Sequence, residues 1–128
     1  MILFRRLGNK KAYYTYFLRF ADGSLYGGIA SDLVRRMGEH FSKDSKCAKY
    51  TKSHRPQFLC AAWSSADRAS ASRLEYRIKH LDKEKKELLA ADPNALSTVF
   101  DEDFAETYTS VPPTEILGIM GSLSPQIP

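Results

Sequence analysis

The chain has 128 residues, of which 43% are hydrophobic, and a formal net charge of +4. This length suits one compact domain, and no apolar run approaches the roughly 20 residues that span a bilayer. The two cysteines lack close spacing, so they imply neither a disulfide framework nor a zinc cluster.

The positive charge is concentrated in the first part of the chain. Residues 1–90 hold all 19 Lys and Arg with 9 Asp and Glu, a surplus of +10, whereas residues 91–128 hold 6 acidic residues and no basic ones. A basic surface attracts phosphate backbones through counterion release, although such a surplus can also serve solubility alone. We therefore predict a nucleic-acid-facing domain over residues 1–90. An acidic, proline-containing extension over residues 91–128 could compete with nucleic acid for its groove.

The opening MILFRR is too short for the apolar core of a signal peptide, so we expect a cytoplasmic protein with no membrane partner.

The N-terminal half predicts a hairpin followed by a helix. Residues 13–20 and 25–29 have the composition of strands and flank the turn residues ADGS. A three-residue loop over 22–24 would pair even with even positions and put Tyr16 and Tyr26 on one face.

The predicted helix covers residues 32–41, with Ser31 as its N-cap. Its apolar side comes from Leu33, Val34 and Met37. Arg36 and His40 lie one turn apart and share a face. Without further information, such a pair is more often an ordinary surface pair on a helix.

Residues 42–56 form the densest basic stretch of the chain. Spaced cations with an interleaved aromatic suit a nucleic-acid backbone, with a base stacking on the ring; the alternative is a solvated loop. The candidate nucleic-acid-binding residues are Lys43, Lys46, Lys49, Tyr50, Lys52 and Arg55.

The apolar run FLCAAW at residues 58–63 predicts a buried strand, and Ser64-Ser65 predict the cap of a helix over 67–81. Glu75 falls at the edge of the apolar stripe of this helix, where a carboxylate needs a partner. That partner could be a cation, Arg36 or Arg77, or solvent at the rim. Helices are also predicted over 82–90 and 114–120.

The order of these residues resembles the GIY-YIG endonuclease domain. Tyr14-Thr15-Tyr16 is followed by Tyr26-Gly27-Gly28, then by Leu33, Arg36 and His40, and later by Glu75 within LEYRIKHL. Within that family the chain is most similar to the small single-domain bacterial branch, the YhbQ-like proteins, over residues 11–89. Only Tyr16, Tyr26 and Gly28 match the name-giving triplets, and the downstream Asn of many relatives has no clear counterpart.

The resemblance implies a fold of the α/β class, in its α+β form, with a three-stranded, mainly antiparallel sheet flanked by helices. It also implies that Glu75 holds one Mg²⁺ or Mn²⁺, that Arg36 binds the scissile phosphate, and that a tyrosine takes the proton of the water. Our first choice of base is Tyr16, assisted by His40, with Tyr26 positioning water or phosphate; the tyrosine roles could be exchanged. Gly28 is expected to leave room for the helix start.

Phosphodiester hydrolysis needs an activated water, countercharge and help for the leaving oxygen, and one cation held by a single carboxylate can supply the last two. The resemblance therefore implies a divalent-metal-dependent endonuclease acting on DNA. Without an obvious recognition domain, we expect a preference for branched or single-stranded segments. The alternatives are a non-catalytic nucleic-acid-binding module with the same fold, in which the two tyrosines are ordinary strand residues, and a protein-interaction scaffold.

Overall fold

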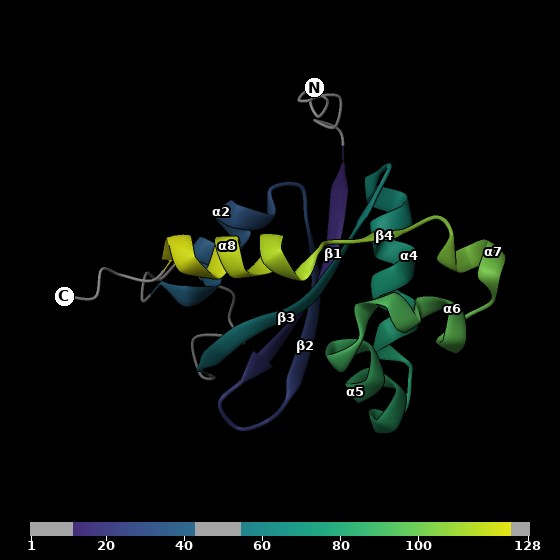
Figure 1. Cartoon of the computed structure of the whole chain (residues 1–128), viewed down its shortest axis with the longest axis horizontal. Coiled ribbons are helices and arrows are strands. Elements are labelled where there is room, and N and C mark those ends of the chain that lie inside the picture. Colours follow the sequence, from purple (N-terminus) through teal and green to yellow (C-terminus); the bar gives the residue numbers. More distant parts are fainter. Residues whose placement is uncertain (1–11, 43–54, 124–128) are drawn as a thin grey trace.

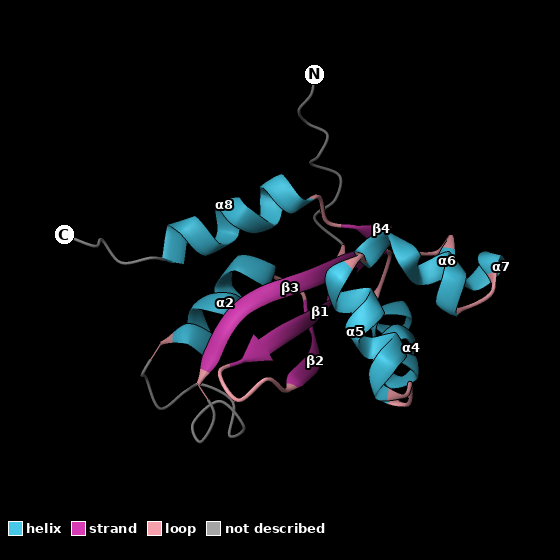
Figure 2. Ribbon diagram, turned by 60° about the horizontal axis from the view of Figure 1, so that its bottom comes forward, coloured by secondary structure: helices cyan, strands magenta, loops and turns pink. Residues whose placement is uncertain are grey.

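The structure is a computed structural model that describes residues 12–42 and 55–123. Within these residues, one antiparallel sheet has the strand order β2-β1-β3-β4 and carries helices on both faces (Figures 1 and 2). The predicted mixed α/β class is confirmed. The prediction of three strands is short by one, because β4 (Thr109–Ser110) adds two residues beside β3.

The long strands lie where alternation of side chains predicts them. β1 (Tyr13–Phe20) has the predicted bounds, and β2 (Leu25–Ala30) is one residue longer than predicted. β3 (Pro56–Ser65) extends the predicted apolar run at both ends and pairs with the other side of β1. β1 is therefore paired along both of its edges, which fixes the direction of its side chains.

The hairpin register confirms the pairing of even with even positions, with Tyr16 opposite Gly28 and Leu18 opposite Tyr26. The loop itself lies one residue earlier than predicted. The Phe20 amide donates to the Ser24 carbonyl oxygen at 2.9 Å, so residues 21–23 form the three-residue loop. Gly23 ends this turn with a φ of +90°, a left-handed conformation that glycine adopts without steric cost.

Three helices follow the strands, and each begins after an aspartate. They are α2 (Leu33–Phe41), α4 (Arg68–Lys79) and α5 (Lys83–Ala91). The side chains of Asp32, Asp67 and Asp82 each accept a hydrogen bond from the amide three residues later, at 2.8 to 3.1 Å. A carboxylate in this position pairs an unsatisfied amide and also interacts favourably with the helix dipole.

The predicted serine caps are therefore wrong. Asp32, one residue after Ser31, caps α2. Ser64 and Ser65 belong to the end of β3, where the ladder with β1 continues, and the cap of α4 is Asp67.

The sheet separates two hydrophobic cores. The core on the side of α2 contains Tyr16, Leu18 and Phe20 of β1 together with Leu33, Met37, Ile116 and Ile119. The core on the side of α4 and α5 contains Phe17 and Trp63 together with Leu74, Ile78 and Leu89. Tyr16 thus points toward α2, whereas α4 lies across the opposite face.

The C-terminal residues build on the same sheet. They form η2 (Pro93–Ala95), α6 (Leu96–Val99), α7 (Glu102–Ala105), β4 and α8 (Pro113–Leu123). Trp63 Nε1 donates to the Pro93 carbonyl oxygen at 2.9 Å, and the Tyr108 hydroxyl donates to the Ser70 carbonyl oxygen at 2.7 Å. The predicted helix over 114–120 is present as the longer α8, which lies beside α2 (Figure 1).

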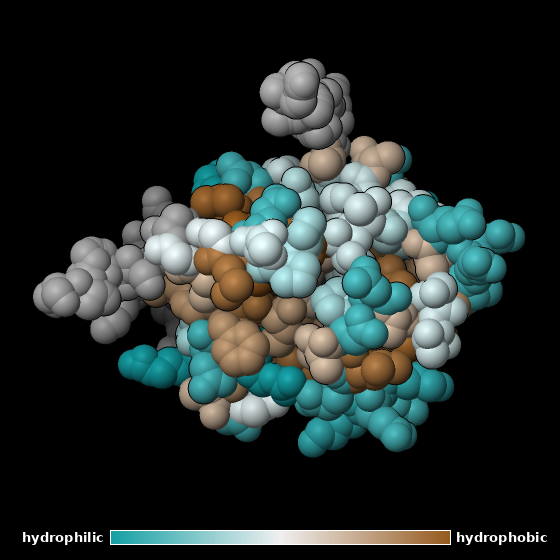
Figure 3. Space-filling view, viewed as in Figure 1, coloured by the Kyte–Doolittle hydropathy of each residue, from teal (hydrophilic) through white to brown (hydrophobic). Residues whose placement is uncertain are grey.

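Hydrophobic and hydrophilic side chains are interleaved on the face shown in Figure 3. Across the described residues, no helix has the length and apolarity needed to cross a membrane. Among the residues with described side chains, Leu117 and Tyr76 are the most exposed large hydrophobic ones.

Candidate active site

Tyr16 lies in the middle of β1, and its side chain packs over Gly28, the residue opposite it on β2. A Cβ built on Gly28 would lie 2.5 Å from the Tyr16 hydroxyl oxygen and 2.6 Å from Cζ. We expected Gly28 to leave room for the helix start. The atoms nearest to it are instead those of the Tyr16 phenol, so the glycine makes the space in which this ring lies.

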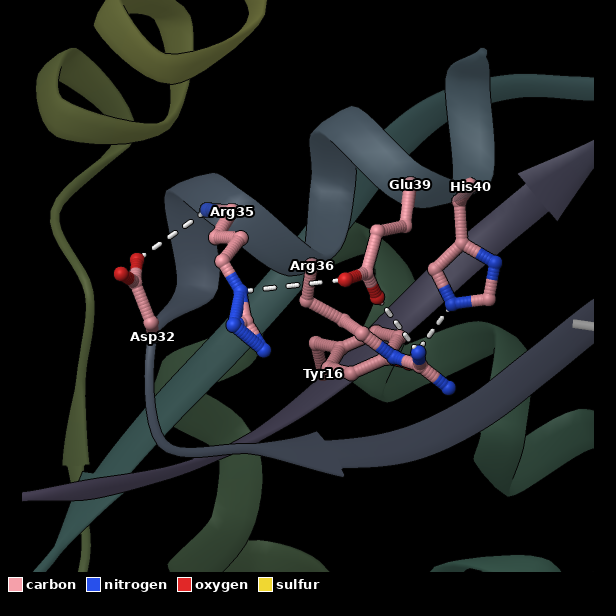
Figure 4. Close-up of polar contacts among 6 residues, drawn as sticks. All are labelled: Tyr16, Asp32, Arg35, Arg36, Glu39 and His40. Carbon is pink, nitrogen blue, oxygen red and sulfur yellow. Dashed lines mark hydrogen bonds and ion pairs between the residues drawn. The ribbon is translucent and has the colours of Figure 1, made fainter. Parts of the chain in front are cut away.

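Helix α2 brings Arg36 and His40 to the Tyr16 phenol. The Tyr16 hydroxyl oxygen lies 2.7 Å from His40 Nε2 and 3.4 Å from Arg36 Nε (Figure 4). The Asp32 cap fixes the first turn of α2, and Leu33 and Met37 bury its apolar side against β1. The structure thus brings Tyr16, Arg36 and His40 together, with the Arg36 and His40 side chains directed at one oxygen, and their catalytic roles stay predictions.

His40 is 1% exposed, and burial lowers the pKa of its imidazole from 6.5 to about 4, with the Arg36 charge acting in the same direction. The ring is therefore neutral at pH 7. Its Nδ1 atom has no hydrogen-bond partner among the residues that the structure describes. The Tyr16 oxygen already accepts from Arg36 Nε, so we assign its own hydroxyl proton to the bond with His40 Nε2, and the ring proton to Nδ1.

Burial raises the pKa of Tyr16 from 10.0 to about 12, although the hydrogen bond and charge of Arg36 act in the opposite direction. The phenol is 1% exposed. At rest the pair is thus a neutral phenol that donates to a neutral imidazole. The charge of Glu75 is the smallest of the causes that raise the pKa of Tyr16.

Tyr26 completes the aromatic surroundings of His40. The two rings meet edge-on, with centroids 5.6 Å apart, and Tyr26 packs in the same way against Phe20 at 6.0 Å. Tyr26 is half-buried, unlike Tyr16. The two candidate tyrosines therefore meet the same imidazole edge-on, and Tyr16 also shares a hydrogen bond with it.

Glu39 is part of this arrangement and was missed by the sequence reasoning. Its Oε1 atom lies 2.7 Å from Arg36 Nη1, and the hydrogen bond from Arg36 holds the pKa of the Glu39 carboxyl below its ordinary value. Arg35 Nε lies 3.7 Å from the other oxygen. The spacing of three and four residues on one helix is the signal that could have identified these pairs.

Glu75 lies on α4, on the opposite side of the sheet from α2. The Thr15 hydroxyl donates to the Ala71 carbonyl oxygen at 3.0 Å and fixes α4 on β1, one turn before Glu75. The Glu75 side chain is 24% exposed, and Oε2 lies 3.1 Å from Lys79 Nζ. The ion-pair partner is thus Lys79 and not Arg36 or Arg77; Arg77 lies over the Phe104 ring, 4.2 Å from its centroid.

The donor set suits one kind of cation. Within the described residues, no group of three or more His, Cys, Asp or Glu side chains gathers as a metal site. A single, partly exposed carboxylate fits Mg²⁺ or Mn²⁺, which keep several waters and take one or two protein carboxylates. It does not fit zinc, which needs several nitrogen or sulfur ligands.

Most of the candidate nucleic-acid-binding residues lie outside the described residues, namely Lys43, Lys46, Lys49, Tyr50 and Lys52. Arg55 is described and exposed. Its carbonyl oxygen accepts from the Ala21 amide at 2.9 Å, which places it beside the β1–β2 turn.

Comparison with known proteins adds an independent finding. The GIY-YIG catalytic domain matches residues 12–87. The chain is 38% identical over 93 residues to a UPF0213 protein of Desulfotalea psychrophila, covering 72% of this chain and 84% of the relative. It is 43% identical over 84 residues to a UPF0213 protein of Fusobacterium nucleatum, and this match covers 66% of this chain and 82% of the relative. A solution NMR structure of a UPF0213 protein of Bacillus halodurans, 36% identical, covers 67% of this chain and 97% of its own, with a TM-score of 0.41.

Proposed function

Because the chain belongs to the GIY-YIG catalytic-domain family, a superfamily of nucleases, we propose that it is an endonuclease that hydrolyses phosphodiester bonds in DNA with the help of one divalent cation. The observation that carries the proposal is the contact of the Tyr16 oxygen with His40 Nε2 at 2.7 Å and with Arg36 Nε at 3.4 Å. Here an imidazole and a guanidinium contact the oxygen of a phenol. Such groups can take a proton from a water molecule and bind the phosphate that this water attacks.

The direction of the Tyr16 hydrogen bond gives the phenol its role. With its O–H assigned to His40 and Arg36 Nε donating to the oxygen at 3.4 Å, one lone pair of the Tyr16 oxygen is left for a water. As that water attacks phosphorus, its proton passes to the Tyr16 oxygen while the original phenol proton passes to His40 Nε2. The water loses one proton, His40 gains one, and Tyr16 ends neutral.

The resting pKa values show what this relay demands. Burial raises the pKa of Tyr16 and lowers that of His40, so an isolated transfer of the phenol proton to the imidazole would be strongly unfavourable. A free tyrosinate is therefore avoided by moving both protons together. The Arg36 charge lowers the pKa of His40, so a phosphate that neutralises Arg36 raises that pKa toward its ordinary value.

Arg36 binds the scissile phosphate, since its side chain is 33% exposed and adjoins the Tyr16 oxygen. Tyr26 positions the water or the phosphate, and the two tyrosines could exchange roles. Glu75 would hold one Mg²⁺ or Mn²⁺, which when bound supplies positive charge to the phosphate and the leaving oxygen. Lys79 releases Glu75 for this purpose.

The substrate class follows from the charge. The surplus of +10 over residues 1–90 supports a polyanionic partner. The sheet and helices form one small body, so we propose a preference for single-stranded or branched DNA over a long duplex sequence.

One observation favours a second function. Tyr16 and His40 are each 1% exposed, and a substrate water must reach the buried phenol. A non-catalytic nucleic-acid-binding module with the same fold would have the basic surface without turnover.

Cleavage assays separate the two functions. Single-stranded, duplex and branched DNA and matching RNA would be incubated with the wild type and Glu75→Ala, with Mg²⁺ and with Mn²⁺. We expect cleavage by the wild type and its loss in the variant, with binding largely retained. Binding by the wild type without cleavage under any condition supports the module.

A further inference from the structure

Two arginines of α2 share one carboxylate. Glu39 Oε1 lies 2.7 Å from Arg36 Nη1, and Oε2 lies 3.7 Å from Arg35 Nε (Figure 4). Each carboxylate oxygen thus faces a different guanidinium. Two oxygens of a phosphate group can take the same places, because guanidinium groups bind both anions with the same fork geometry.

The three side chains border a hollow that a ligand can enter. Arg35, Arg36 and Glu39 line a space of about 180 Å³ where β2 turns into α2. The Arg35 side chain is 71% exposed, and the Glu39 and Arg36 side chains are 30% and 33% exposed. The carboxylate therefore lies at the surface, within reach of a polyanion.

The ion pairs of Glu39 with Arg35 and Arg36 are weak enough for another anion to replace the carboxylate. Ion pairs between partly exposed side chains contribute little stability, and Glu39 is joined to its helix by freely rotating bonds. A phosphate that binds at Nη1 of Arg36 competes with the Glu39 carboxylate for this atom. Binding at this position therefore requires the carboxylate to move aside.

We propose that Arg35 and Arg36 form one phosphate-binding site whose resting occupant is the Glu39 carboxylate, and that a phosphate of the nucleic-acid backbone replaces it. Arg35 then becomes a further phosphate-binding residue, and Glu39 sets the affinity of the site by competing for it. The inference rests on the proposed function, because it takes the phosphate at Arg36 to belong to a nucleic acid.

The test measures binding and not cleavage. A fluorescein-labelled single-stranded oligonucleotide of about 16 nucleotides would be titrated in EDTA at several salt concentrations. We expect Glu39→Gln to bind about two- to fivefold more tightly than the wild type. In Glu39→Gln the slope of log affinity against log salt concentration should steepen by the amount expected for about one phosphate contact. Adding Arg35→Ala should remove both the gain in affinity and the steeper slope.

Glu87→Gln is the matched control. Glu87 also pairs with an arginine, Arg19, at 2.6 and 2.8 Å, and its removal changes the net charge equally but away from α2. This variant should bind as the wild type does. If Glu39→Gln fails to fold, Arg35→Ala alone decides, since a 71% exposed side chain can be removed safely and its loss should weaken binding about two- to fivefold.

Equal affinities of Glu39→Gln and Glu87→Gln, or a gain that survives Arg35→Ala, would overturn the inference. A wild type that cleaves DNA while Glu39→Gln binds no better contradicts this inference alone. A wild type that fails to bind the oligonucleotide even at low salt contradicts it together with the proposed function.

Discussion

Gly28 and Tyr16 face each other across the β1–β2 ladder, and the phenol ring of Tyr16 occupies the space that a side chain at position 28 would fill. The glycine is thus required by the site and not by the backbone, because its φ is not in the left-handed region. The position of the phenol oxygen between His40 and Arg36 depends on this empty space.

Gly28→Ala should displace the phenol from both partners. We expect a loss of about 1 to 3 kcal/mol in the free energy of unfolding from overpacking, and a fall of about a hundredfold in cleavage rate from the misplaced oxygen. Gly27→Ala is the control, since a Cβ there would meet its nearest atoms at an ordinary 3.8 Å. Urea unfolding and single-turnover cleavage measure the two effects, and wild-type kinetics in Gly28→Ala would refute the geometry.

The buried imidazole predicts a dependence of stability on pH. The pKa of His40 is about 4 in the folded chain and near 6.5 when unfolded, so the unfolded chain binds more protons between these values. Stability is therefore complete above about pH 6.5 and falls toward pH 4, by at most about 1.4 kcal/mol per pH unit.

His40→Gln should remove this contribution while His80→Gln, at an exposed position, should keep it. The measurement is the free energy of unfolding in urea at a series of pH values. Identical pH profiles for the wild type and His40→Gln would show that the imidazole is not held neutral by burial.

Lys79 competes with a cation for Glu75. Lys79→Met should lower the Mg²⁺ concentration for half-maximal cleavage about two- to fivefold, because the carboxylate no longer has to release an ammonium at 3.1 Å. Lys85→Met removes the same charge from the exposed face of α5 and serves as the control. An equal Mg²⁺ requirement in both variants would show that Lys79 does not compete with the cation for Glu75.

Helix α8 contributes to the core on the side of α2. Ile119 is 7% exposed and Leu117 is 70% exposed on the same helix. Ile119→Ala should therefore cost about 2 to 5 kcal/mol in the free energy of unfolding, and Leu117→Ala at most about 0.5 kcal/mol. Equal costs in urea unfolding would mean that α8 does not pack on the sheet. Deletion of residues 93–128 would remove these core contacts, so it cannot by itself test whether the acidic extension competes with nucleic acid.

The sequence predicted the elements whose pattern is strong. The alternation from Tyr13 to Phe20 is long enough to define β1 and its two faces, and the even pairing brings Tyr16 and Tyr26 to one side. β4 was not predicted, because a strand of two residues is too short to show an alternation of side chains. The cap errors arose because serine and aspartate are nearly equivalent in capping preference, and the choice between neighbours depends on where the preceding strand ends.

The site was predicted less evenly. The resemblance identified Tyr16, Arg36 and His40, whose contacts the structure contains, but it gave no reason to consider Glu39. Its pairing with Arg36 follows from helical spacing and could have been read from the sequence. The reason for Gly28 could not, because it depends on which residue of β1 lies opposite, and that is fixed by the hairpin register.

The central claim is that the Tyr16 oxygen takes the proton of the attacking water. The most direct test is the single-turnover rate of DNA cleavage by Tyr16→Phe with Mg²⁺, beside Tyr14→Phe as the control from the same strand face. We predict a fall of about 10² to 10⁴ in rate for Tyr16→Phe, with DNA affinity and the Tyr14→Phe rate nearly unchanged. Cleavage by Tyr16→Phe at the wild-type rate would contradict the account.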